Sequence, residues 1–123
     1  MSTQIQDAVA ALKAALEAVG QLDGRVYENP AATVTGVGAV IAPPTVEWGS
    51  YGHDAGPTEA AFVVHLVVPF DEYATTRLYE LVEPMREAIE GDPLFSVTSA
   101  SPGLLQQGGT QLPTYALTVD VGL

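Results

Sequence analysis

The strongest constraint on the fold is one helix pattern, at residues 71–93, that lies between two strand-rich regions. Asp71 is the expected N-cap, and Glu72 adds negative charge at the positive end of the helix dipole. Gly91 followed by Pro93 predicts where the helix ends. The apolar residues recur at steps of three and four, which predicts one buried face made of Tyr73, Leu78, Leu81, Val82, Met85 and Ile89.

Pro84 lies inside this helix pattern. An internal proline removes one backbone hydrogen bond and clashes with the preceding turn, at a cost of about 3 kcal/mol. The sequence therefore predicts a kink at Pro84 or a helix in two parts. Arg77 and Arg86 are expected to pair locally with acids on a solvent-facing surface, which consists of Glu80, Glu83, Glu87 and Glu90.

A second helix is predicted near the N-terminus, ending close to Gly20. Thr3 and Gln6 have the spacing of a capping box. The run is too short for the several heptads of a coiled coil, so packing on a sheet is expected. Its apolar stripe is predicted to consist of Ile5, Val9, Leu12, Leu16 and Val19.

The remaining patterns predict short strands separated by Gly, Pro and Asp-Gly turns. The region 33–41 forms either one strand or, because Gly36 and Gly38 weaken it, a bulged or split strand at 37–41. Residues 108–109 are Gly-Gly, which indicates a hairpin. The other predicted strands are residues 25–27, 45–48, 60–68, 95–100, 104–106 and 112–121.

The strand at 60–68 is the clearest, and we expect it to be central. It is apolar except for His65, which predicts burial on both faces or against a neighbouring subunit. The order of helix, strands, helix and strands lacks a regular strand–helix alternation. We therefore predict an α+β fold, with a mixed or mainly antiparallel sheet and two helices packed on one face, in a single domain of residues 1–123.

Composition excludes several functions. The chain has fifteen acids against four basic residues and a net charge of −11, so it lacks the basic patch that phosphate binding needs. Acidity alone can serve solubility, and an acidic wall past which DNA slides is also compatible. There is no cysteine, which excludes disulfides, thiolate metal sites and cysteine nucleophiles. Without a secretory signal pattern or an apolar run of about 20 residues, we expect synthesis in a cytoplasm and no membrane contact.

No motif for catalysis, cofactor or metal binding is complete. Gly36 and Gly38 begin a dinucleotide fingerprint, but the third glycine and the following helix are missing. Ser50 lacks the spacing of a nucleophile elbow. His53 and His65 are the only histidines and have no metal-ligand spacing, so His65 is expected to be a hydrogen-bonded core or interface residue. We expect a protein that is not an enzyme.

The irregular region at residues 49–57 is the candidate site for contact with a partner protein, because loops often carry function. Trp48 and Tyr51 border it, and each suits core packing as well as it suits an interface anchor. His53 and Asp54 extend the same loop with polar groups.

Several segments together resemble the tail terminator proteins of long-tailed phages that infect actinobacteria. The main one is LYELVEPMREAIEGDP at residues 78–93. An Ala/Leu-rich first helix, Arg25-Val26-Tyr27 with Pro30 after it, and PPTVEW at residues 43–48 add to the resemblance. A paired-strand ending completes it, so it rests on element order over nearly the whole chain.

The resemblance implies a structural virion protein that forms a homo-oligomeric, six-fold ring on the last ring of the tail tube protein. Such a ring ends tail polymerisation and presents a surface for a head-tail connector or neck protein, while DNA passes through its lumen without specific binding. The location would be the virion tail, assembled in the host bacterial cytoplasm. The alternatives are a head-completion or neck protein, or a small-molecule-binding or enzymatic domain that uses His65, His53 and nearby acids.

Overall fold

The computed structural model describes residues 4–22, 24–28, 37–48, 57–68, 72–107 and 110–122. Two α-helices lie within these residues, α1 (Gln4–Glu17) and α2 (Ala74–Glu90), and a short 3₁₀ helix η1 (Gly20–Leu22) follows α1. The strands are β1 (Val26–Tyr27), β2 (Gly38–Ile41), β3 (Thr45–Trp48), β4 (Pro57–Val67), β5 (Phe95–Gln107) and β6 (Thr110–Gly122).

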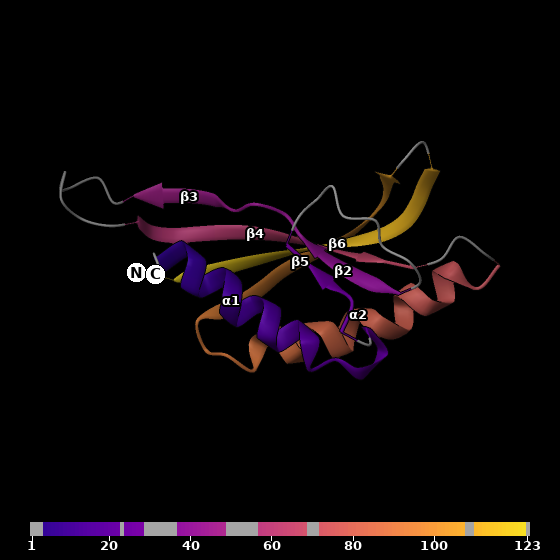
Figure 1. Cartoon of the computed structure of the whole chain (residues 1–123), viewed down its shortest axis with the longest axis horizontal. Helices are drawn as coiled ribbons and strands as arrows, with labels where there is room; N and C mark the ends of the chain where they lie inside the picture. Colours follow the sequence, from indigo (N-terminus) through magenta and orange to yellow (C-terminus); the bar gives the residue numbers. More distant parts are fainter. Residues whose placement is uncertain are drawn as a thin grey trace.

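The strands of the described residues form one sheet in the order β1-β2-β4-β6-β5, with β3 also paired to β4. Only the β1–β2 pair is parallel. Both helices lie on the same side of the sheet (Figure 1). The predicted α+β fold, with a mixed and mainly antiparallel sheet and two helices on one face, is confirmed.

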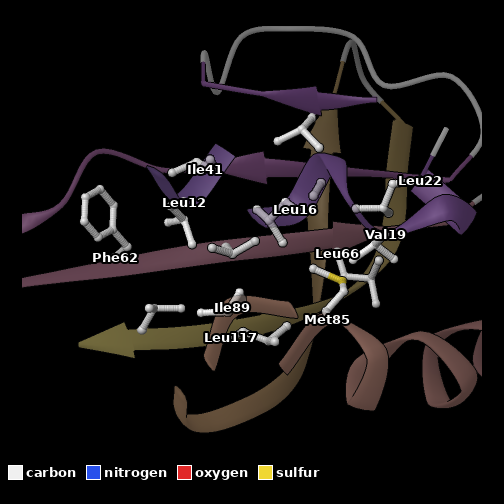
Figure 2. Close-up of a cluster of buried hydrophobic side chains, with 14 of the residues drawn as sticks. Leu12, Leu16, Val19, Leu22, Ile41, Phe62, Leu66, Met85, Ile89 and Leu117 are labelled. Atoms are coloured by element: carbon white, nitrogen blue, oxygen red, sulfur yellow. The ribbon is translucent and has the colours of Figure 1, made fainter. Parts of the chain in front are cut away.

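β4 is the central strand, as predicted, because it pairs with β2 and β3 on one side and with β6 on the other. Its even-numbered residues from Ala60 to Leu66 are buried beneath the helices, while Ala61, Val63 and His65 on the opposite face are half-buried. This alternation follows from the two-residue repeat of a strand. One cluster of buried side chains joins both helices to β1, β2, β4, β5 and β6, and its centre is shown in Figure 2.

α2 runs without interruption through Pro84, so the prediction of a helix in two parts is wrong. Met85 and Ile89, which follow the proline, are both fully buried against the sheet. Each such side chain contributes about 1.5–3 kcal/mol on burial, which offsets the cost of the proline.

The ends and the face of α2 differ from the prediction in part. Tyr73, not Asp71, holds the N-cap, without a capping side-chain hydrogen bond, and Asp71 lies outside the described residues. Tyr73 is 58% exposed and therefore lies off the predicted buried face. The C-cap is Gly91, as predicted, and its N–H donates to the Glu87 carbonyl oxygen at 3.1 Å.

α1 buries Ala8, Leu12 and Leu16, whereas Ile5 and Val9 of the predicted stripe are only half-buried. Thr3, the predicted capping residue, lies outside the described residues. Gly24 precedes β1 with φ of +74°, a left-handed conformation that favours glycine. Of the strand predicted at 33–41, the described residues contain β2, which lies within the shorter alternative at 37–41, and residues 33–36 lie outside the described residues.

β5 is one strand of 13 residues, so the prediction of two separate strands at 95–100 and 104–106 is wrong. Pairing with β6 continues from Phe95 to Gln107, through a register shift between Val97 and Ser99. β5 has a partner strand on one side only, and proline is tolerated on an edge strand because its missing N–H can face away from the ladder. An edge position cannot be recognised from local sequence.

Candidate assembly surface

Of the four residues predicted to contact a partner, only Trp48 lies within the described part of the chain. Trp48 ends β3 and is 61% exposed, so it is not a core residue and is available for contact with a partner. Tyr51, His53 and Asp54 lie outside the described residues. The contact site formed by these four residues therefore stays a prediction.

His65 lies on the sheet face that points away from the helices. Its partners in register are Val40 on β2 and Ala116 on β6, both apolar. Burial without a charged partner lowers the pKa of His65 below its ordinary value, because desolvation disfavours the charged imidazolium. The expectation that His65 is a core or interface residue stays a prediction.

A hollow of about 330 Å³ opens on the sheet face opposite the helices, near the end where β3 lies. Three carboxylates line it, from Glu47 on β3, Glu59 on β4 and Asp120 on β6. Glu47 and Glu59 are direct cross-strand partners, so their like charges destabilise the β3–β4 pair. Within the described part of the chain, no three His, Cys, Asp or Glu side chains are grouped so that they could hold a metal ion.

Arg86 pairs with two acids of α2, as predicted. Its guanidinium contacts the Glu83 carboxylate at 3.2 Å and the Glu90 carboxylate at 2.6 Å. Glu90 also accepts the backbone N–H of Val97 at 3.1 Å, which joins the last turn of α2 to β5. The remaining charge of this helix faces solvent, since Glu80 and Glu87 are exposed.

The free edge of β5 is the longest unpaired strand edge in the described residues. Between Asp92 and Asp120 the chain contains no charged residue and no histidine, so the β5–β6 hairpin carries no charge except at Asp120 near the end of β6, in a protein of net charge −11. Exposed edges of monomeric proteins are commonly protected by charged side chains. The edge of β5 lacks this protection over its whole length.

A second free edge belongs to β3. β3 pairs with β4 on one side, and no strand of the described residues pairs with its other side. Figure 1 shows β3 and the far end of the β5–β6 hairpin at opposite ends of the molecule. Apart from the outer edge of the two-residue β1, the described strands therefore leave two different open edges, those of β3 and β5, toward opposite ends of the molecule.

Comparison with known proteins adds no relative: no family model matches the chain, and no curated protein matches it. None of the helices described here is both long enough and apolar enough to cross a membrane.

Sequence reasoning missed the uncharged hairpin, although its signal is simple. The absence of charge between Asp92 and Asp120 is visible in the sequence. Its meaning depends on the strand order, which places β5 at an edge and β6 beside β4. That order is a non-local property, and only the structure supplies it.

Proposed function

We propose that this protein is a structural component of a phage tail that forms a ring on the tail tube, ends its polymerisation and presents the head-attachment surface. The observation that carries the proposal is the pair of different open strand edges at opposite ends of one sheet. A ring requires a heterologous interface, in which one patch meets a different patch of the next subunit. Two unlike edges on one subunit meet this requirement.

The arrangement of elements supports the same proposal. The sequence resemblance rests on an N-terminal helix, short strands, an acidic helix and a paired-strand ending, and the fold has these elements in this order. Six copies in a closed ring would satisfy edges that are open in the single chain. Pairing across subunits would also remove the aggregation hazard of a long free edge.

The charge distribution fits a channel through which DNA passes. Exposed carboxylates occupy two surfaces, the outer face of α2 and the hollow formed by β3, β4 and β6. If one of these two surfaces lines the lumen, its carboxylates would repel the DNA phosphates and keep DNA from binding to the wall. We expect DNA ejection to slow when the charges of the lumenal surface are reversed, and to stay unchanged when the charges of the other surface are reversed.

The test is assembly of tails with and without this protein, followed by electron microscopy. We expect tails of defined length with an added ring at the head-proximal end when the protein is present, and overlong tails without a ring when it is absent. Unchanged tail length with a ring bound to the head-side connector would instead indicate a head-completion or neck protein. Unchanged tails without any ring would overturn the proposal.

A further inference from the structure

The distal part of the β5–β6 hairpin extends beyond the rest of the sheet. β4 pairs with β6 only as far as the Val67–Thr114 pair, while β5 and β6 continue to the Gln107–Thr110 pair. We call this two-stranded extension the arm; it comprises residues 104–107 and 110–113 (Figure 1). A two-stranded ribbon is at best marginally stable in water, so an arm of this kind gains stability when a further strand pairs with it.

Most of the free edge around the arm carries features that oppose strand addition. Pro113, opposite Leu104, lies on the side of β6 that β4 no longer covers, and its missing N–H removes a donor from that edge. On β5, the irregularity between Val97 and Ser99 and the proline at position 102 interrupt the proximal edge. The stretch of β5 without such a feature is residues 103–107.

The complementary edge belongs to β3. Its four residues are close in number to the five residues of the open stretch of β5, residues 103–107. Trp48 at the end of β3 is 61% exposed, and an aromatic side chain of this kind is a frequent anchor in protein interfaces. Because the arm and β3 lie at opposite ends of the molecule, contact between them joins copies head to tail (Figure 1).

Charge selects the same pair of surfaces. Two copies that each carry a charge of −11 repel one another unless the surfaces in contact lack like charges. The arm has no charged residue, so Glu47 on β3 meets no carboxylate from it. Contact between two β3 edges would instead bring their Glu47 side chains together.

We propose that residues 103–107 of one copy add as a strand to the open edge of β3 of the next copy. The choice of a head-to-tail contact rests on the proposed ring function. Pairing between the arms of two copies would instead give a closed dimer. The occupant of each open edge is thus a second copy of this chain.

The single tryptophan of the chain reports on this contact directly, because Trp48 lies in the proposed interface. Over a concentration series of the purified protein, we expect its emission to shift to shorter wavelengths and its quenching by acrylamide to fall as copies associate. Both changes should reverse on dilution. The Gln106→Lys variant, which places charge on the arm, should abolish them, and the matched variant Thr75→Lys on the exposed face of α2 should not.

Cross-linking distinguishes the possible pairings, and the absence of native cysteine makes single-cysteine variants clean probes. We expect a size-tagged Gln106→Cys protein mixed with Thr45→Cys protein to form a mixed bis-maleimide dimer, both in solution and on capped tails. Cross-linking of Gln106→Cys to itself alone would overturn the proposal in favour of an isologous arm–arm dimer. Cross-linking no stronger than that of a Thr75→Cys control, both in solution and on capped tails, would also overturn it.

The two proposals fail separately. If tails are capped but no mixed cross-link forms, the terminator function stands and this interface is wrong. If the mixed cross-link forms but tail length does not respond to the protein, head-to-tail assembly stands and its role lies elsewhere.

Discussion

Replacement of Ile89 by alanine tests whether the half of α2 beyond Pro84 is packed as the structure shows. Ile89 is fully buried in the cluster shown in Figure 2, one turn after Met85. The change removes roughly three methylene equivalents at about 0.8 kcal/mol each, and an incompletely filled cavity adds to this loss. We expect the free energy of unfolding to fall by about 3–4 kcal/mol, within the range known for buried Ile→Ala changes.

Urea denaturation followed by circular dichroism measures this loss. A matched control, Glu87→Ala, lies in the same part of α2 with an exposed side chain, and we expect it to change stability by less than about 0.5 kcal/mol. The milder Ile89→Val variant should cost about 0.5–1.5 kcal/mol, which guards against a variant that fails to fold. An Ile89→Ala loss below about 1 kcal/mol would refute the packing of α2 beyond the proline.

Further predictions concern backbone conformation, charge pairing and pH. Gly24→Ala should lower the free energy of unfolding by about 1–2 kcal/mol because φ is +74°, whereas Gly20→Ala, with open space around the new methyl group, should not; equal losses in thermal melts would contradict this. Arg86→Ala should lower the thermal unfolding midpoint only slightly, and added salt should reduce that effect, because the pair with Glu90 is exposed to solvent; a large, salt-independent loss would contradict this. The folded-state pKa of His65 lies below its unfolded value of 6.5, so on acidification the unfolded chain binds a proton at His65 before the folded chain does. The contribution of His65 to the free energy of unfolding is therefore full above about pH 6.5 and declines as pH falls through that value. The stability difference between wild type and His65→Gln, measured by urea denaturation, should therefore change in this window, and a constant difference would contradict the burial of the imidazole.

Local sequence patterns predicted the elements whose periodicity is strong. The helix at 71–93 and the central strand at 60–68 correspond to α2 and β4, because burial of a repeated apolar face determines both. β3 lies within its predicted bounds, since Pro43 and Pro44 on one side and glycine on the other confine it.

The features that were missed depend on neighbours far away in sequence. Pro84 is accommodated because Met85 and Ile89 pack on the sheet, and that packing has no local signature. β5 continues through Pro102 because it lies at an edge. Tyr73 is solvent-exposed although its spacing fits the apolar face, since the helix proper begins only after it.

The candidate site was predictable only in outline. Trp48 was judged equally suited to core packing and to an interface anchor, and its exposure rules out the first, while contact with a partner stays a prediction. The arm was not identified, because its definition requires knowing where pairing with β4 stops. The hollow lined by Glu47, Glu59 and Asp120 likewise joins three strands that are distant in sequence.

The length of tails assembled with this protein tests the central claim most directly. Electron microscopy of tails made with wild type, with Gln106→Lys and without the protein should show capped tails of uniform length only for wild type, with overlong tails in the other two samples. Tails that have the same length distribution in all three samples, with no added ring at their head-proximal end, would contradict the account.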